Sequence, residues 1–168
     1  MTLSGPEALS ERHDRTQFSS GKPPLDEWLR RRALANQQNG FSAVVVICDA
    51  DRVIAYYALA PTAASPSSLP RSIRTGQPPD PIPCILLGQL AVDHAYAGKG
   101  IGLGLLKHAY MRAVTAAKLV GGRALLVNAI DADALAFWER RGFLQTKDDK
   151  YVLFRAIASI AKSIENAS

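Results

Sequence analysis

The sequence predicts an α/β fold in which a mixed and twisted sheet of about six or seven strands carries helices on both faces. Three observations indicate this class. An apolar run over 85–92 leads through a glycine-rich turn into a long amphipathic stretch that ends near residue 119. Two β-branched and aromatic runs, 42–48 and 52–60, are separated by a short turn and predict a hairpin. A third apolar run, 123–130, is followed by a helical pattern and then by another strand.

The composition is that of one globular domain spanning residues 1–168. Hydrophobic residues make up 48% of the chain and charged residues 21%, and the length suffices for a sizeable core. The apolar run over 43–48 is far too short to cross a membrane, and the N-terminus lacks the pattern of a secretory signal. Cys48 and Cys84 lie in apolar surroundings without C-x-x-C spacing, which predicts reduced core residues of a cytoplasmic protein.

Local signals predict the elements before the central strand. Residues 9–15 are expected to form a short first strand or a leading segment. Two prolines favour a helix over 25–36, because proline is tolerated in the first helical turn, and Gly40 is a plausible residue to end it. Residues 61–83 hold seven of the ten prolines and show no periodicity. Such a loop is usually functional or mobile, so it either borders an acceptor site or is a mobile excursion.

The central strand is followed by glycines at every second position, namely Gly98, Gly100, Gly102 and Gly104. Glycine lets a backbone approach a ligand closely, and unpartnered N–H groups at a helix start attract anions. We therefore expect a phosphate or diphosphate here, although a tight turn without a ligand also fits. The spacing matches neither the dinucleotide motif G-x-G-x-x-G nor the P-loop G-x-x-x-x-G-K-[ST]. In the helix that follows, the predicted buried face comprises Leu103, Leu106, Tyr110, Val114 and Ala117.

The C-terminal third is expected to alternate between strands and helices. After the strand over 123–130, Asp131 is a credible N-cap for a helix over 132–141. A last strand over 151–154 precedes an apolar stripe within 155–165, which we expect to form a docking or dimer helix.

Two of these motifs resemble known signatures. The order of strand, G-x-G-x-G turn and helix resembles the acetyl-coenzyme A loop of the GCN5-related N-acetyltransferases (GNAT). The segment ALAFWERRGF at 134–143 resembles their second signature, A-x-x-[FL]-Y-x-x-x-G-F. Further short motifs follow an order similar to that in the TacT/AtaT-type toxins of toxin–antitoxin pairs: LSERHD from Leu9, Phe18 with Gly21, LDEWLR from Leu25, YYALA from Tyr56 and LAVD from Leu90. The resemblance covers about residues 9–155 and leaves 156–168 as a helical extension.

The resemblance implies a GNAT fold, in which the central strand splays away from the strand over 123–130 to admit acetyl-coenzyme A (acetyl-CoA). It also implies a toxin that acetylates the amino group of aminoacyl-tRNA and inhibits translation, with a ribbon-helix-helix antitoxin and a homodimer as partners. The implied cofactor-binding residues are Leu90, Ala91 and Val92 along the pantetheine arm, Gly98, Lys99, Gly100, Ile101, Gly102 and Leu103 around the diphosphate, and Asn128. No metal is expected, since the sequence has no H-x-x-x-H motif, cysteine cluster or paired acidic motif.

The implied catalytic position departs from the family pattern. Where the family usually has a tyrosine that acts as general acid toward the thiolate, this chain has Trp138. An indole N–H donates hydrogen bonds but is not a usable acid near neutrality. Three interpretations follow: Trp138 shapes the acetyl pocket while water protonates the thiolate, its N–H stabilises the charge, or the domain is catalytically weak and acts mainly through antitoxin binding. At Asn128 the chain also departs from the family pattern, which often has a histidine at this strand position.

The implied acceptor needs no strong general base. A free α-amino group titrates near about pH 7.7–8.0, against about 10.4 for lysine, so an appreciable fraction is neutral in the cytosol. His13 and His94 are accordingly expected to be surface or packing residues. The net charge of +5 and arginine clusters such as 30–32 are consistent with an RNA partner. An acetyltransferase for a small-molecule or peptide amine is the alternative.

Overall fold

The computed structural model describes residues 1–167, which divide into two compact units. The N-terminal unit comprises Met1–Ala60 and Gln89–Ala109, and the C-terminal unit comprises Pro61–Gly88 and the chain from Tyr110 onward. Three long elements contribute to both units: β3 (Arg52–Ala64), β4 (Ile82–Val92) and α4 (Ile101–Val120). Within residues 1–167, no helix combines the length and apolar character that a membrane span requires.

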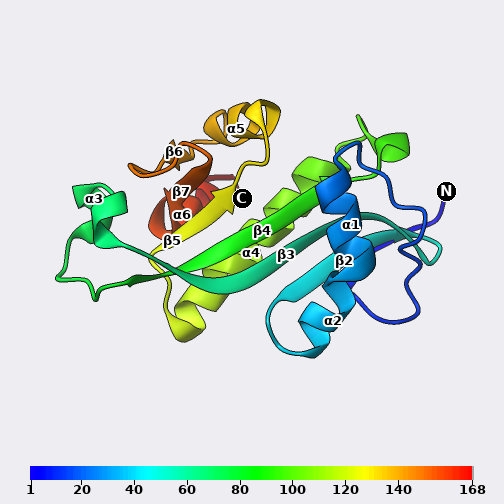
Figure 1. Cartoon of the computed structure of the whole chain (residues 1–168), viewed down its shortest axis with the longest axis horizontal. Coiled ribbons are helices and arrows are strands. Elements are labelled where there is room, and N and C mark those ends of the chain that lie inside the picture. The colour runs from blue at the N-terminus through cyan, green and yellow to red at the C-terminus, as the bar shows by residue number, and fades with distance from the viewer. Residues whose placement is uncertain (168) are drawn as a thin grey trace. The chain divides into compact units, whose positions relative to one another are not determined.

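The N-terminal unit is a sheet with the strand order β1-β2-β3-β4 (Figure 1). β1 (Leu3–Ala8) pairs antiparallel with β2 (Ala43–Asp49), and β2 pairs antiparallel with β3. The register of this hairpin runs from Ala43↔Leu59 to Asp49↔Arg52, which confirms the predicted hairpin. Two helices, α1 (Pro23–Arg31) and α2 (Ala33–Gln38), lie between β1 and β2 in the chain.

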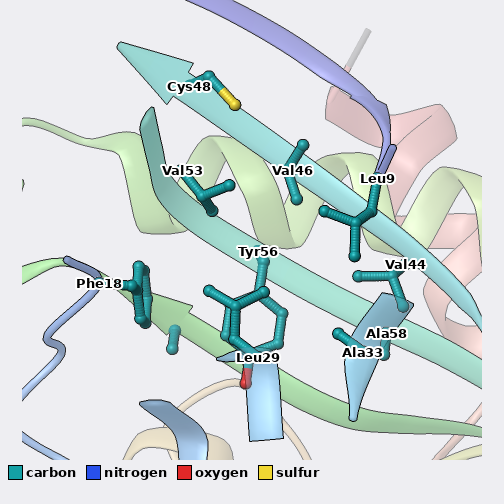
Figure 2. Close-up of a cluster of buried hydrophobic side chains, with 11 residues drawn as sticks. Leu9, Phe18, Leu29, Ala33, Val44, Val46, Cys48, Val53, Tyr56 and Ala58 are labelled. Atoms are coloured by element: carbon teal, nitrogen blue, oxygen red, sulfur yellow. The ribbon is translucent and has the colours of Figure 1, made fainter. Parts of the chain in front are cut away.

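Aromatic and aliphatic side chains form the core on one face of this sheet. Figure 2 shows Tyr56 of β3 among side chains from α1, α2 and β2. The Tyr56 ring stacks on Trp28 with centroids 5.9 Å apart and meets the edge of Phe18 at 5.5 Å. Its hydroxyl donates to the Leu25 carbonyl at 2.7 Å, and burial raises the pKa of Tyr56. The full cluster comprises Leu9, Phe18, Leu29, Ala33, Val44, Val46, Cys48, Val53, Tyr56, Ala58 and Ala91.

Helices cover both faces of β3, as predicted. Successive side chains of a strand point to opposite faces. Tyr56 faces α1, and the next residue, Tyr57, is hydrogen-bonded through its hydroxyl to His108 Nδ1 of α4 at 2.8 Å. α1 and α4 therefore lie on opposite faces of this strand.

In the N-terminal region the structure excludes one of the two alternatives for 9–15 and corrects the predicted helix over 25–36. The first strand is Leu3–Ala8 rather than 9–15, which follows it as a turn held by side-chain hydrogen bonds. The helix expected over 25–36 is two helices that meet at Arg32, whose φ is −120°. Leu29 and Ala33 are both fully buried in the same core, which explains why the apolar spacing continues across the break.

The C-terminal unit is a mixed sheet with the order β4-β5-β7-β6. β5 (Ala124–Asn128) pairs in parallel with β4 and antiparallel with β7 (Val152–Ala156). β6 (Leu144–Gln145) is a two-residue strand that the sequence pattern did not reveal. Together with β1 to β3, these strands make up the seven strands of one mixed sheet, as predicted.

The proline-rich segment over 61–83 is more ordered than predicted. β3 extends through its first residues, and a 3₁₀ turn, η1 (Pro66–Ser68), and a short helix, α3 (Arg71–Arg74), precede β4. Leu69 and Ile73 are buried in the core of the C-terminal unit. The Arg123 side chain donates to the Ile73 and Thr75 carbonyls at 3.0 and 3.1 Å. The segment is thus anchored and is not a loose excursion.

α4 buries a different set of residues from the predicted one, whereas the stripe of α6 packs partly as expected. The buried face of α4 comprises Leu105, Leu106, Ala109, Ala113 and Val114, whereas Leu103 is 57% exposed, so its predicted burial is wrong. In α6 (Ile157–Ala167), Ile157 and Ile160 are buried within the chain itself. These two residues of the apolar stripe therefore pack on their own unit, as expected of a docking helix, whereas Ala161 and Ile164 are half-buried.

α5 (Ala132–Glu139) is fixed at both ends. The Asp131 carboxylate accepts a hydrogen bond from Ala134 N at 2.8 Å, which confirms the predicted N-cap. Gly142 has φ +85°, and this left-handed residue allows Phe143 N to donate to Trp138 O at 3.2 Å. Helix α5 thus holds the backbone of Trp138 in place.

Candidate functional site

The glycine turn lies between β4 and α4 and is open to solvent. After β4 the chain makes a single 3₁₀ turn, η2 (His94–Tyr96), and α4 starts at Ile101. Gly98 and Gly100 have φ values of +76° and +79°, which residues with a Cβ atom rarely adopt. An added Cβ at either residue would meet no atom within 4 Å. The turn therefore has both the conformation and the clearance for a ligand close to its backbone.

Main-chain N–H groups line this turn without protein partners. Within residues 1–167, the N–H groups of 98–103 donate no hydrogen bond, and the first donor of α4 is Gly104 N, which bonds to Gly100 O at 3.1 Å. The dipole of α4 adds positive potential here. Residues 98–100, including the Lys99 side chain, are exposed. This arrangement can bind a diphosphate, whose oxygens accept from several N–H groups at once.

The strand before the turn continues beyond its pairing with β5. The parallel register of β4 with β5 runs from Ile85 to Leu87, although β4 has 11 residues and ends at Val92. Among the described residues, β4 beyond Leu87 is not paired with β5, which itself ends at Asn128, and the splaying of the central strand stays a prediction. The backbone of β4 after Leu87 can then pair with an extended ligand, as a neighbouring strand would.

The N-terminal unit brings the two predicted cofactor-binding segments together. Ala91 is buried in the core, and Leu90 and Val92 are half-buried. Gly102 packs close to the strand, because a Cβ added there would meet Val92 Cγ2 at 3.4 Å. Gly102 thus serves close packing of α4 on β4, whereas Gly98 and Gly100 supply the left-handed backbone of the turn.

The predicted catalytic residue, Trp138, belongs to the C-terminal unit. Its side chain is 6% exposed and lies edge-on to Phe137 and Phe143, with ring centroids 4.9 and 5.1 Å apart. The indole N–H has no hydrogen-bond partner among residues 1–167 and is not fully buried. The Trp138 ring is therefore packed against two phenylalanine rings, while its N–H makes no hydrogen bond to the described part of the chain. Asn128 ends β5 in the same unit and is exposed.

Sequence reasoning missed a buried carboxylate at the base of the turn. Asp93 is fully buried and accepts hydrogen bonds from Ala95 N at 2.9 Å, Ser19 N at 3.1 Å and Arg52 Nη2 at 3.3 Å. The one feature of the sequence that could have indicated this carboxylate is a single acidic residue after an apolar strand. The same pattern is typical of an ordinary strand end.

A second polar contact lies beside this carboxylate. The Tyr96 hydroxyl donates to Asp49 Oδ2 at 2.5 Å. This hydrogen bond lowers the pKa of Asp49 and raises the pKa of Tyr96. The Arg52 guanidinium lies 5.9 Å from the Tyr96 ring centre. The residues just before the glycine turn are thus held by charged and polar groups from β2 and β3.

The histidines singled out from the sequence have structural partners. His94 is 70% exposed at its side chain, and its Nδ1 donates to the Ser19 carbonyl at 2.7 Å. His13 is buried: its Nδ1 accepts from Ser10 N at 2.9 Å, so the ring proton lies on Nε2, which donates to Glu7 at 3.0 Å. His13 is a packing residue and His94 a surface residue, as expected.

Glu7 and His13 lie with Cys48 in the one part of residues 1–167 where such donor atoms cluster, within 4.8 Å of one another. His13 Nε2 already donates to Glu7, and the Arg12 guanidinium lies 3.2 Å from the same ring nitrogen, so this nitrogen has protein partners instead of a free lone pair for a metal. Burial raises the pKa of the Cys48 thiol to about 11, which disfavours the thiolate that binds metals. The donor set fits a hydrogen-bonded structural cluster better than a metal site.

Comparisons with known proteins are consistent with this geometry. A family model described as "Acetyltransferase (GNAT) domain" matches residues 40–145. A tRNA-acetylating toxin from Mycobacterium tuberculosis is 45% identical over 135 residues, which cover 80% of this chain and 81% of that relative.

Two solved structures are similar over nearly the whole chain. AtaT complexed with acetyl-methionyl-tRNAfMet has a TM-score of 0.85 at 26% identity, and 97% of this chain and 98% of that chain are covered. A tyrosine-to-phenylalanine mutant of the AtaT toxin, bound to the C-terminus of the antitoxin AtaR and acetyl-CoA, has a TM-score of 0.79 at 25% identity. In that comparison 95% of this chain and 94% of the other are covered.

Proposed function

Because this chain belongs to the GCN5-related N-acetyltransferase (GNAT) family, we propose that it is a toxin that transfers the acetyl group of acetyl-CoA to the amino group of aminoacyl-tRNA and so inhibits translation. The observation that carries this proposal is the turn over 98–103, whose N–H groups are free to bind an anionic carrier. The tRNA-acetylating relative and the AtaT complex with acetylated methionyl-tRNA support the acceptor.

The proposed acetyl-CoA site is built mainly from backbone. The N–H groups of 98–103 bind the diphosphate, and Lys99 adds positive charge at the exposed side of the turn. The backbone of Leu90, Ala91 and Val92 lies along the pantetheine arm. Asn128 is proposed to contact the cofactor from the exposed end of β5. A site made of main-chain groups tolerates side-chain differences from the family pattern, because the N–H groups remain.

The reaction joins the amine nitrogen to the acetyl carbon and breaks the carbon–sulfur bond of the thioester. The amine must be neutral when it attacks, and an α-amino group with a pKa near about 7.7–8.0 meets this need without a strong base. The leaving thiolate takes up one proton while the amine nitrogen loses one. We assign to the Trp138 N–H a hydrogen bond that stabilises the thiolate, and to water the proton that the thiolate receives.

The proposed partners follow from charge and from the relatives. Arg30, Arg31 and Arg32 are exposed at the end of α1 and suit the phosphates of tRNA. The AtaT complex with the AtaR C-terminus supports an antitoxin partner, and we propose that it is of the ribbon-helix-helix type. We further propose a homodimer that acts in the cytoplasm, where tRNA is charged.

One observation favours an alternative. A tryptophan at the position of the general acid fits a domain that binds acetyl-CoA but catalyses weakly and acts mainly through its antitoxin. Acetylation of a small-molecule or peptide amine is a further possibility that the acceptor test below distinguishes.

The full-length protein is expected to transfer label from radioactive acetyl-CoA to the aminoacyl end of charged tRNA. Uncharged tRNA, a lysine-containing peptide and free amino acids serve as competing acceptors, and the product is identified by nuclease digestion and mass spectrometry. The rate should rise between about pH 6.5 and pH 8 as the α-amino group loses its proton. Transfer to the peptide or to free amino acids, with charged tRNA unmodified, would contradict the proposed acceptor.

A further inference from the structure

The structure points to Asp93 as a positioning residue: we propose that its buried carboxylate, held by Arg52 and Ser19, sets the place at which the glycine turn presents its N–H groups to the cofactor diphosphate. This inference rests on the proposed function, because it concerns the same site. Asp93 does not itself touch the cofactor in this proposal. Its carboxylate is fully buried and its charge is paired with Arg52.

The carboxylate joins three segments that are distant in sequence. Oδ1 accepts from Ala95 N at 2.9 Å and so caps η2, the 3₁₀ turn that precedes the glycines. Oδ2 accepts from Ser19 N at 3.1 Å and from Arg52 Nη2 at 3.3 Å. The Asp93 N–H donates to Ile54 O at 2.8 Å, which ties the same residue to β3. Both oxygens and the main chain of Asp93 are therefore committed to fixed partners.

Neighbouring contacts also hold residues 93–96, which form the structural base of the glycine turn, in place. His94 N and His94 Nδ1 both donate to the Ser19 carbonyl, at 2.9 and 2.7 Å. The Tyr96 hydroxyl donates to Asp49 at 2.5 Å. Asp93, His94 and Tyr96 are thus each bonded to a distant segment of the chain. Ala95 is bonded to Asp93 within the same turn.

The turn beyond this base has little support of its own. Residues 97–100 are exposed, and the space around Gly98 and Gly100 is empty to 4 Å. The position of the turn is therefore set from its two ends, by the contacts of Asp93 on one side and on the other by α4, which is anchored by the buried Leu105 and Leu106. Because several N–H groups must converge on one diphosphate, a shift of about 1 Å at the base weakens binding strongly.

An Asp93→Asn change is a sharp test, because it keeps the shape of the side chain. Both oxygens of Asp93 accept hydrogen bonds, so an amide must turn its NH₂ group toward a donor, either Ala95 N or Ser19 N with Arg52. That donor–donor contact displaces the base of the turn. We expect the Kd of acetyl-CoA to rise roughly tenfold, while kcat at saturating acetyl-CoA stays within about twofold.

A second acetyl donor, S-acetylpantetheine, distinguishes the loss of a positioning role from a general loss of folding. It carries the thioester arm but has neither the diphosphate nor the nucleotide. If Asp93 acts through the diphosphate turn, Asp93→Asn should leave kcat/KM for S-acetylpantetheine within about twofold of wild type. A variant that is merely less well folded would lose activity with both donors.

Glu7→Gln is the matched control. Glu7 lies in the same unit and also accepts from an arginine, with Arg12 at 2.9 Å, and among residues 1–167 its side chain makes no hydrogen bond to residues 93–104. The change removes the same charge and keeps the side-chain shape. We expect no change in the Kd of acetyl-CoA.

If Asp93→Asn does not fold, Arg52→Gln carries the same test, because the Arg52 side chain is 36% exposed and easier to replace. It should raise the Kd of acetyl-CoA and spare S-acetylpantetheine. Equal losses with both donors, or a Kd like that of Glu7→Gln, would overturn the role of Asp93 and leave the proposed function intact. A wild-type protein that binds no acetyl-CoA would overturn both.

Discussion

Replacing Gly100 by valine is expected to weaken acetyl-CoA binding about 100-fold or more and to abolish transfer at ordinary acetyl-CoA concentrations. Gly100 has φ +79°, a conformation that costs about 1–2 kcal/mol for a residue with a Cβ atom. A valine side chain would also fill the open space in front of the turn, where the diphosphate is proposed to lie. Isothermal titration calorimetry with acetyl-CoA measures the loss.

Gly40→Val is the control for this change. Gly40 has the same φ, +79°, lies in the same unit, and likewise has no atom within 4 Å of an added Cβ. It follows α2 and carries the same backbone strain without being part of the glycine turn. If Gly40→Val and Gly100→Val weaken binding equally, backbone strain explains the loss and the turn has no special role.

Replacing Trp138 by phenylalanine is expected to lower kcat about 100-fold with little change in the KM for acetyl-CoA, because one hydrogen-bond donor to a developing charge is lost. The phenylalanine keeps an aromatic ring between Phe137 and Phe143, so the fold should persist. Trp138→Tyr restores a donor and supplies a hydroxyl, and it should be at least as active as wild type. Steady-state kinetics on charged tRNA separates kcat from KM.

The possible outcomes distinguish the three roles considered for Trp138. Full activity of Trp138→Phe would contradict the hydrogen bond and leave a ring that shapes the pocket while water protonates the thiolate. Activity that appears only in Trp138→Tyr, with an inactive wild type, would show a degenerate enzyme. Circular dichroism of each variant establishes that the fold is intact before kinetics are compared.

The sequence predicted the local parts of this molecule well. Alternation and apolar runs located the β2–β3 hairpin, and the glycine spacing located the turn before α4. The Asp131 cap was predictable because its partner, Ala134 N, is three residues away. The spacing of apolar residues predicted the helix, but it did not predict which of them are buried. Leu103 fits the helical period, yet it lies in the first turn of α4 and is exposed.

The long-range polar contacts were not predictable from local patterns. Asp93 contacts residues 41 and 74 positions away, and Tyr96 contacts Asp49 across 47 positions. A single sequence shows only an acidic residue and a tyrosine after a strand. The break at Arg32 was hidden for a different reason, because the apolar residues on either side of it bury against the same core.

The central claim is that the N–H groups of 98–103 bind the diphosphate of acetyl-CoA. A titration of ¹⁵N-labelled protein with acetyl-CoA, followed by ¹H–¹⁵N correlation spectra, observes these groups directly. The amide signals of Gly98, Gly100 and Gly102 should shift in proportion to saturation, and S-acetylpantetheine should leave them in place. Saturable shifts elsewhere in the spectrum, with these glycine signals unmoved, would contradict the claim.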